Sequence, residues 1–333
     1  MAGRTRVPYA ARVFKRHVGA RLSHCVRLET DSRLLPALML DPSGEAVFSS
    51  VLRTNQLRAT ISSNATYCDN WTDPEPASDH GTFHLIDSGV CWVRSEALDA
   101  PERLAAGDLI LFPDGAGHVL SGSPDNKTAP EARFTSMLCG EFEFATGKRN
   151  PIVEALPRCF VVHEQESGMQ FRQLAQLMLH EARSNSFGSR AILDKMADTL
   201  FVMAVRHYIE HAPQRRGLLA ALCDPRLAHA LEAMHGQPEK EWTVAALAEA
   251  AHMSRTSFAN HFASVLGSGP IEYLTHWRMT EARRLLADPR TSVAAVADRL
   301  GYRTEAAFRR AFKRVTGVGP GVVRRQEHRL EGA

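Results

Sequence analysis

The feature that most constrains the fold is an internal repeat near the C-terminus. The segment TVAALAEAAHMSRTSFANHFASVLGSGP at 243–270 aligns with SVAAVADRLGYRTEAAFRRAFKRVTGVGP at 292–320, and the second copy has one extra residue at its central turn. Each copy predicts a short apolar helix, a tight turn and a second helix with phenylalanines one helical turn apart. This is the pattern of a helix-turn-helix unit, whose second helix is presented to a DNA major groove. The repeat therefore predicts two such units, at 243–263 and 292–313.

Turn and core residues support the repeat. Gly301 stands where the turn of the second copy needs a residue with positive φ, and His252 takes the equivalent place in the first copy. The segment 271–286 between the copies predicts one helix, about 24 Å long at about 1.5 Å per residue. We expect two recognition helices roughly 34 Å apart, which is one turn of DNA. Four phenylalanines are expected to form the cores of the two units: Phe258, Phe262, Phe308 and Phe312.

Charge is divided unevenly along the chain. Residues 1–40 have a net charge of +6, residues 41–217 have −7, and residues 218–333 have +4. An acidic middle and a basic end indicate a divided protein, with nucleic acid as a candidate partner for the basic end. We expect residues 1–40 to be a disordered basic extension.

Composition limits the class of protein. The chain has 333 residues, 44% of them hydrophobic and 23% charged, which is typical of a soluble protein of about two domains. No run approaches the roughly 20 apolar residues of a membrane span, and no export signal is recognised. The six cysteines form no CxxC pair and no zinc-ligand spacing, so a disulfide framework is excluded as the main support of the fold. The sequence therefore predicts a cytoplasmic protein with reduced thiols and no membrane contact.

The hydrophobic pattern of the sequence before the repeat changes once, from a pattern typical of β-strands to one typical of helices. Over about 46–144, short apolar runs alternate with Gly, Asp and Pro, which is typical of an antiparallel sandwich or barrel. From Gln170 the period is helical, and a helix is expected over 190–211, followed by a linker at Pro213. The apolar stripe of this helix is predicted either to make a dimer or interdomain contact or to cover the barrel. The stripe consists of Ile192, Met196, Leu200 and Met203.

The C-terminal hundred residues resemble the DNA-binding domain of AraC-type transcription regulators. The matching text is WTVAALAEAAHMSRTSF at 242–258, YLTHWRMTEARRLL at 273–286 and VADRLGYRTEAAFRRAFKRVTGVGP at 296–320, in the family's order and spacing. The resemblance continues over 217–235, the usual lead-in helix, and residues 46–210 resemble the cupin-type sensor domain of one branch. It implies an α+β protein in two domains. The N-terminal one is a cupin-like antiparallel β-barrel with trailing helices, and the C-terminal one is an all-α double helix-turn-helix domain.

Domain boundaries and function follow from the repeat and the resemblance together. We expect a sensor and dimerisation domain at 41–212, a linker and lead-in helix at 213–235, and the DNA-binding domain at 236–333. The implied function is that of a sequence-specific transcription regulator, controlled by a small molecule or an oxidant. Double-stranded DNA, a second copy in a homodimer and RNA polymerase are the expected partners, and no cofactor is expected. Two alternatives stay open: a metal-binding cupin enzyme, and an architectural protein that binds DNA without sequence preference.

The resemblance also implies which side chains read DNA. Arginine pairs with guanine edges, asparagine with adenine, and lysine mostly with phosphates. Many family members carry Arg where this chain has Ser257 and Asn260, which leaves the sequence of the first half-site open. In the first unit the implied residues are Arg255, Thr256, Ser257, Asn260 and His261. In the second unit they are Thr304, Glu305, Arg309 and Arg310, with Lys313 and Arg314 nearer the phosphates.

A sequence motif typical of cupins is the basis of the metal-binding alternative. GDLILFPDGAGH at 107–118 fits the second cupin motif up to its closing histidine. In metal cupins that histidine completes a site begun by an H-x-H and a Glu, whereas here Thr82 takes the first place of the H-x-H in HGTFHLIDSG at 80–89. We predict a small-molecule pocket or a residual barrel architecture in place of a metal site, with His84 and His118 as candidate sensor residues. The imidazoles that would bind zinc, iron or nickel in the alternative are those of His80, His84 and His118.

Two cysteines are the other candidate switch. Cys68 precedes the first β segment and Cys139 follows the last, so we expect a barrel to bring them close. A low-pKa thiol detects oxidants in a reducing cytoplasm. The segment AHMSRTSFANHF at 251–262 resembles the reactive-chlorine-responsive regulators of the same branch, which are thought to sense by cysteine oxidation. Cys68 and Cys139 are therefore candidate oxidant sensors, with buried, inert cysteines as the alternative.

Overall fold

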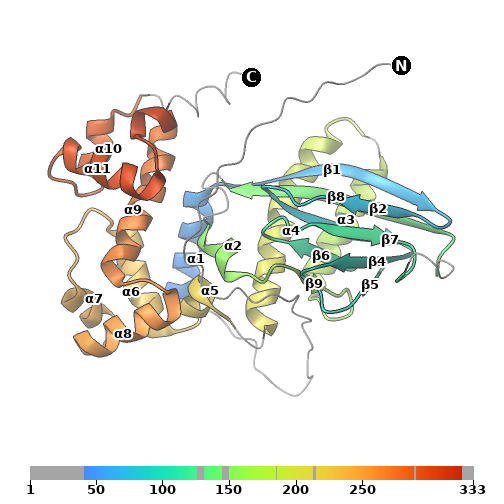
Figure 1. The fold of residues 1–333 in the computed structure, drawn as a ribbon, viewed down its shortest axis with the longest axis horizontal. Helices are drawn as coiled ribbons and strands as arrows, with labels where there is room; N and C mark the ends of the chain where they lie inside the picture. Colours follow the sequence, from blue (N-terminus) through green and yellow to red (C-terminus); the bar gives the residue numbers. More distant parts are fainter. Residues whose placement is uncertain are drawn as a thin grey trace.

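The protein has a β-rich N-terminal part and a helical C-terminal part, which confirms the predicted two-part α+β architecture (Figure 1). The predicted basic extension lies outside the described residues. The computed structural model describes residues 41–125, 131–144, 150–184, 186–212, 215–288 and 290–324.

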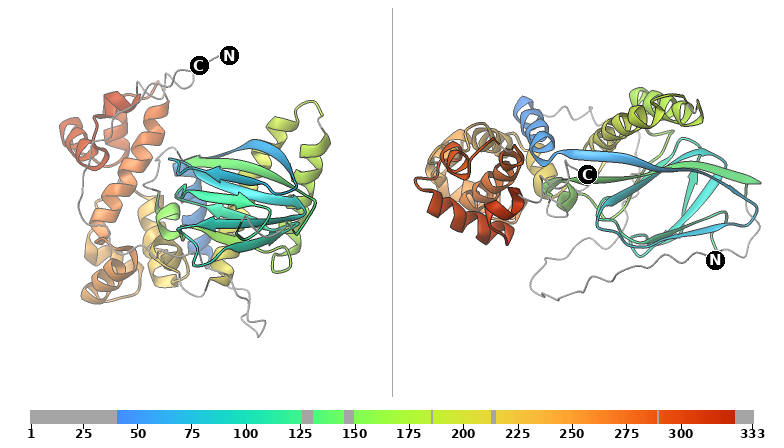
Figure 2. Two further views of the ribbon diagram at one scale, coloured as in Figure 1. Left: turned by 45° about the vertical axis from the view of Figure 1, so that its right-hand side comes forward. Right: turned by 90° about the horizontal axis from the view of Figure 1, so that it is seen from above.

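Two antiparallel sheets form the β-rich part. The larger sheet has the strand order β1-β8-β3-β6-β9, and the smaller sheet has the order β2-β7-β4-β5. The sheets face each other, and α3 and α4 lie on the outer side of the larger one (Figure 2). The strands are β1 Leu57–Cys68, β2 Thr72–Glu75, β3 Gly81–Ser88, β4 Val90–Ser95, β5 Glu102–Ala105, β6 Leu109–Phe112, β7 His118–Ser121, β8 Phe134–Phe144 and β9 Phe160–Val162.

Side chains of the larger sheet alternate between two cores. In β6, Leu109 and Leu111 pack with the helices outside, whereas Ile110 and Phe112 point between the two sheets. This alternation follows from the period of two in a β-strand. The space between the sheets is therefore apolar, and any polar group that points into it must find a partner there.

The segment 46–55, expected to begin the β-rich region, is helical instead. Helix α1 runs over Pro42–Asn55, and the Asp41 carboxylate accepts a hydrogen bond from a backbone N–H of its first turn at 2.8 Å. Aspartate at the N-cap and proline in the first turn are the ordinary start of a helix. The β prediction was wrong here, and the Asp-Pro pair at the start of this segment begins a helix. The buried face of α1 includes Val47, Phe48 and Val51.

The two long helices after the sheets confirm the predicted change of period. Helices α3 (Met169–Ser184) and α4 (Ser189–His211) form a hairpin, preceded by the short helix α2 (Pro151–Ala155), and α4 packs along β1. Of the predicted stripe, Leu200 is buried and Met196 and Met203 pack against the core, whereas Ile192 is 47% exposed and the residue after it is buried. The stripe that covers the sheet includes Leu193, Ala197, Leu200 and Ala204.

The lead-in segment at 217–235 forms two helices, not the single helix that was predicted. Helix α5 (Gly217–Leu222) ends before Asp224, which caps α6 (Pro225–Gly236). Proline lacks the N–H that a continuous helix needs at this position, so a new helix begins.

Both predicted helix-turn-helix units are present. The residues that stand at corresponding places in the two turns have positive φ, 53° at His252 and 75° at Gly301. A Cβ on Gly301 would lie 2.0 Å from the Glu239 carbonyl oxygen, so this glycine also permits a close approach of two backbones. The helices are α7 Val244–Ala250 and α8 Arg255–Leu266 in the first unit, α9 Pro270–Ala287 between the units, and α10 Val293–Arg299 and α11 Glu305–Thr316 in the second.

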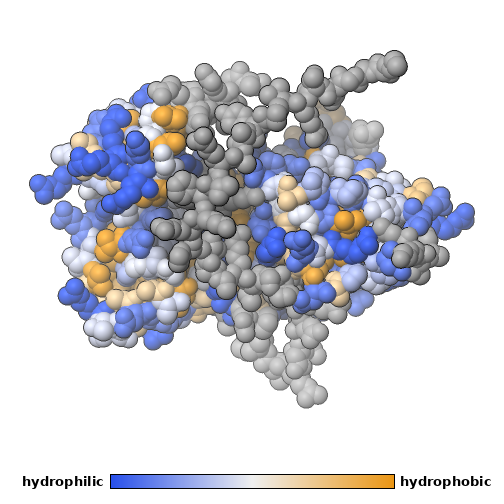
Figure 3. Space-filling model, in the orientation of Figure 1, coloured by the Kyte–Doolittle hydropathy of each residue, from blue (hydrophilic) through white to orange (hydrophobic). Residues whose placement is uncertain are grey.

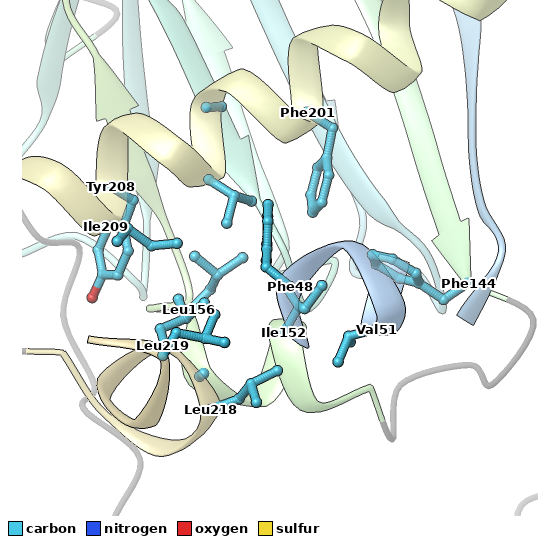
Figure 4. Packing of buried hydrophobic residues seen from close by; sticks show 14 of the residues in the cluster. Phe48, Val51, Phe144, Ile152, Leu156, Phe201, Tyr208, Ile209, Leu218 and Leu219 are labelled. Atoms are coloured by element: carbon cyan, nitrogen blue, oxygen red, sulfur yellow. The ribbon is translucent and has the colours of Figure 1, made fainter. Parts of the chain in front are cut away.

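The two units have different cores, although all four predicted phenylalanines are fully buried. The first unit belongs to a core that continues through α1, α4 and the outer face of the larger sheet, which we call the shared core. Figure 4 shows the part of this core between α1, α4 and α5. The second unit has its own core, which we call the second-unit core. The shared core includes Phe48, Phe201, Leu219, Phe258, Phe262 and Trp277. The second-unit core includes Met279, Leu286, Val296, Phe308 and Phe312.

Candidate nucleic-acid interface and sensor cluster

The N-terminal half of α8 presents small polar side chains to solvent. The Ser254 hydroxyl caps the helix by accepting a hydrogen bond from the Ser257 backbone N–H at 3.3 Å. The cap fixes the start of the helix and so the direction in which its first turn points. Four of the five predicted side chains of this unit are exposed: Arg255, Thr256, Ser257 and Asn260.

The fifth, His261, is half-buried and faces α6. Its Nε2 lies 2.6 Å from Oδ2 of Asp224, the residue that caps α6. Burial of Asp224 works against ionisation, but hydrogen bonds from Arg226 and His261 outweigh it and hold the pKa of this carboxyl at about 2. The pair fixes α8 against the lead-in helix. Asp224 was missed by sequence reasoning because 37 residues separate it from His261.

Helix α11 is the more basic of the two recognition helices. The Thr304 hydroxyl caps it by accepting from a backbone N–H at 3.2 Å, and Glu305 accepts a hydrogen bond from Arg309 Nε at 2.6 Å. Glu305 therefore holds the Arg309 side chain along the helix. Hydrophilic side chains gather over this unit at the upper left of Figure 3. The exposed basic side chains of α11 are Arg309, Arg310, Lys313 and Arg314.

Helix α9 connects the units and also contacts the segment before the first one. Arg278 on α9 donates to the carbonyl oxygens of Pro238 at 2.5 Å and Lys240 at 2.9 Å. Its guanidinium carbon lies 5.7 Å from the ring centre of Tyr302, which follows the turn of the second unit. Arg278 thus ties the second unit to the segment that precedes the first.

Inside the barrel, three polar side chains form one chain of contacts between the sheets. Cys139 Sγ on β8 lies 3.1 Å from Nδ1 of His84 on β3, and His84 Nε2 lies 2.7 Å from Nε2 of His118 on β7. All three are buried, with exposures of 6% or less. Phe112 stacks on His118 with 3.9 Å between the ring centres. The cluster therefore joins the larger sheet to the smaller one.

The hydrogen positions in this cluster follow from its partners. His118 Nδ1 lies 3.0 Å from the Ala116 carbonyl oxygen, which only accepts, so Nδ1 carries the proton. Neutral His118 then accepts at Nε2 from His84 Nε2–H, and His84 Nδ1 accepts from the Cys139 thiol. Each polar atom of the chain has one defined role.

Burial sets the protonation state of the cluster. It lowers the pKa of His84 to about 3, with the neighbouring His118 adding to the effect, and it also lowers the pKa of His118. It raises the pKa of the Cys139 thiol to about 12. At neutral pH the cluster is therefore a thiol and two neutral imidazoles. The low-pKa thiolate expected at Cys139 is not what this environment favours.

The predicted approach of Cys68 to Cys139 was wrong. On the β1–β8 ladder Cys68 pairs with Phe134, whereas Cys139 pairs with Ser63, so the two cysteines lie five strand positions apart. This is about 16 Å at about 3.3 Å per residue, and a disulfide needs Cα atoms within about 7 Å. Cys68 is exposed and Cys139 is buried.

The three imidazoles of the metal-binding alternative also do not lie together. His80 is exposed and lies before β3, whereas His84 and His118 point between the sheets. Among the residues that the structure describes, no group of three His, Cys, Asp or Glu side chains is arranged to hold a metal ion. The described residues of this barrel therefore lack the set of ligand side chains that a metal cupin needs.

Comparison with known proteins identifies the family. Residues 46–210 match the cupin family model, and residues 247–326 match a helix-turn-helix domain model. A putative AraC-like transcription regulator of Streptomyces antibioticus is 31% identical over 296 residues, covering 83% of this chain and 97% of that protein. The chain belongs to the AraC-like family of transcription regulators.

Two further similar proteins are a transcriptional activator and a solved DNA-binding domain. The RCS-specific HTH-type transcriptional activator RclR of Escherichia coli, a reactive-chlorine-responsive regulator, is 28% identical over 85% of this chain and 98% of its own. The solved DNA-binding domain of AdpA in complex with a target DNA is 36% identical, covers 31% of this chain and 92% of its own, and has a TM-score of 0.29. The chain is a DNA-binding transcription regulator with an N-terminal cupin. Within the described ranges, no helix is long and apolar enough to cross a membrane.

Proposed function

We propose that this regulator places the N-terminal halves of α8 and α11 in two successive major grooves of its operator. The observation that carries this proposal is the exposure of corresponding polar side chains on two capped helices of one repeat. Asn260 suits an adenine edge and Arg310 a guanine edge, while Lys313 and Arg314 are placed to contact phosphates. His261 serves mainly to position α8 through Asp224. The proposed contact set is Arg255, Thr256, Ser257, Asn260, His261, Thr304, Glu305, Arg309, Arg310, Lys313 and Arg314.

The test compares operator and random duplexes of equal length. We expect specific binding at least 10³-fold tighter than random binding at physiological salt, as for other sequence-specific proteins. Equal affinity for both duplexes would favour the architectural alternative. Fluorescence anisotropy over a series of salt concentrations measures both quantities.

We further propose that the barrel receives the signal at Cys139, with His84 and His118 as its partners. The enclosed Cys139–His84–His118 chain supports this, because oxidation replaces the S–H donor by a longer S–O–H group and adds an oxygen atom in a close-packed core. Hypochlorous acid would convert the thiol to a sulfenic acid, with chloride and a proton released. The added oxygen would displace Cys139 from its 3.1 Å contact with His84 and so disturb the link between β8, β3 and β7.

A set of cysteine variants tests the sensor proposal. After one equivalent of hypochlorous acid, we expect the operator affinity of the wild type and of Cys68→Ser to change about tenfold, which corresponds to about 1.4 kcal/mol. Cys139→Ser should not respond, and Cys91→Ser is the matched control for a second buried cysteine. A response of Cys139→Ser equal to that of the wild type would contradict the assignment. A small-molecule effector would then be the remaining class.

The outer face of the α3–α4 hairpin is the proposed homodimer contact. The inner face of α4 covers the larger sheet, whereas four large apolar side chains of the hairpin stay exposed: Met169, Leu177, Phe187 and Ile192. Burying them against a second copy would place four helix-turn-helix units on two half-sites. Sedimentation of the wild type and of Leu177→Glu tests this, and we expect the variant to be monomeric. Contact with RNA polymerase would follow at promoters where the regulator activates.

A further inference from the structure

A cavity of about 570 Å³ lies where the sensor domain meets the first helix-turn-helix unit. Its walls come from α2 on the sensor side and from α8 and α9 on the DNA-binding side, with α5 and the end of α1 between them. This volume is in the range of natural small-molecule sites. An occupant would touch both parts of the protein at once.

The floor of the cavity is apolar and aromatic. Ala155, Leu218 and Trp277 line it and are each at most 5% exposed. Tyr273 and Trp277 stand one helical turn apart on α9, and the stacking of His235 on Trp277, with 3.6 Å between ring centres, holds that indole in place. Such a floor favours a hydrophobic body, and aromatic faces attract cations.

Among the described residues that line the cavity there are two carboxylates and one guanidinium. Glu154 on α2 and Glu272 on α9 are exposed at opposite walls. Arg216 is the lining arginine, and its guanidinium donates to the Leu156 carbonyl oxygen at 2.8 Å. The last turn of α8, ending at Leu266, adds the partial negative charge of a helix C-terminus. The N-terminus of α9 has the opposite sign, but Glu272 stands in its first turn and offsets it.

We propose that this interdomain cavity binds a small hydrophobic monocation, such as an arylalkylamine. The ammonium group lies between Glu154 and Glu272, and the apolar body rests on the Tyr273–Trp277 floor. Because α8 forms one wall, the occupant presses directly on the helix that the proposed function places in DNA. Only this coupling step rests on the proposed function, since the binding site stands on the cavity itself.

The test uses three probes of equal size and different charge, with full-length protein and no DNA. Calorimetry with 6-phenylhexylamine, 6-phenylhexanol and 6-phenylhexanoate measures the charge preference directly. We expect the amine to have a Kd at least tenfold below that of the alcohol, with the carboxylate weakest. Equal affinities, tightest binding of the carboxylate, or no binding of the amine would overturn the proposal.

Variants locate the site. We expect the double substitution Glu154→Gln, Glu272→Gln to bring the Kd of the amine to that of the alcohol, and Ser264→Phe, which fills the cavity from α8, to weaken all probes at least tenfold. Glu141→Gln on β8 is the matched control, because that carboxylate is exposed and lies outside the cavity. Unchanged thermal unfolding shows that each variant is folded. A preference that survives both cavity variants would place the amine elsewhere and overturn the assignment.

A second readout separates this inference from the proposed function. Operator affinity is measured with and without saturating amine. If the amine binds in the cavity but operator affinity does not change, the site stands and the coupling to α8 is wrong. If no operator binding is seen at all, the proposed function fails while the calorimetric result still decides the site.

Discussion

The first helix-turn-helix unit packs into the shared core, whereas the second unit is held by a core of its own. The first also has the Asp224–His261 pair that fixes its recognition helix, and it forms a wall of the interdomain cavity. The second carries the larger positive charge on its recognition helix. Two copies of one repeat thus differ in what they pack against and in the positive charge of their second helices.

Truncation of a core phenylalanine should have the largest effect, and it should destabilise different parts of the chain in the two units. Phe258→Ala and Phe308→Ala remove equivalent, fully buried rings, and each should cost about 3–5 kcal/mol. We expect Phe308→Ala to raise hydrogen exchange only in the C-terminal half of α9 and in 290–324, whereas Phe258→Ala should raise it in α5 to α8 and in α1. Peptide-resolved exchange measures this. Simultaneous opening of the whole chain in both variants would show that the two cores are one cooperative unit.

Mild acid should destabilise the barrel and the lead-in helices but not the second helix-turn-helix unit. Burial lowers the pKa of His84 and of His235 to about 3 each, while residues 290–324 contain no histidine. In the unfolded chain these imidazoles protonate near pH 6.5, so the unfolded state binds more protons and stability falls as the pH drops below that value. The loss is about 2 kcal/mol per such histidine at pH 5.

Exchange at pH 7 and pH 5, corrected for the intrinsic rate, tests this expectation. The barrel and the lead-in helices should lose protection while 290–324 keeps its own. Equal losses in both regions would contradict the assignment of the buried histidines as neutral groups.

Removal of single basic side chains should weaken DNA binding by smaller amounts. Arg310→Ala should cost about 1–3 kcal/mol of operator binding, and Arg309→Ala should cost less because Glu305 already holds that guanidinium. Lys313→Ala should reduce the salt slope by about one, and Asn260→Ala in α8 should leave the slope unchanged. Arg190→Ala on α4 is the control, since it is exposed and distant from both recognition helices in sequence. Unchanged footprints of Arg309→Ala and Arg310→Ala would exclude the proposed contacts.

The smallest expected effect concerns the positioning pair of the first unit. Asp224→Asn keeps an oxygen that caps α6 but removes the charge that holds His261. We expect a loss of stability of about 1 kcal/mol and a twofold to fivefold loss of operator affinity. Thermal unfolding and anisotropy measure the two quantities. Wild-type affinity in the variant would show that α8 is positioned by its core alone.

The sequence predicted the repeat, the four phenylalanines and both positive-φ turn residues, because these depend on local spacing. The sequence did not predict contacts between side chains that lie far apart along the chain. Nothing local indicates that His261 faces Asp224, or that Cys139 pairs with Ser63 and not with the region of Cys68. The helix at α1 was missed although its Asp-Pro start was visible. The Cys139–His84–His118 chain depends on three strands from two sheets, and only the fold brings these strands together.

A footprint on the DNA upstream of this chain's own gene is the most direct test of the proposal that both helix-turn-helix units read one operator. Purified full-length protein would be used at near-physiological salt, with and without reductant. We expect protection in two major-groove segments about one helical turn apart for each chain, with a change on oxidation that Cys139→Ser abolishes. No protection beyond that of random DNA, in either redox state, would contradict it.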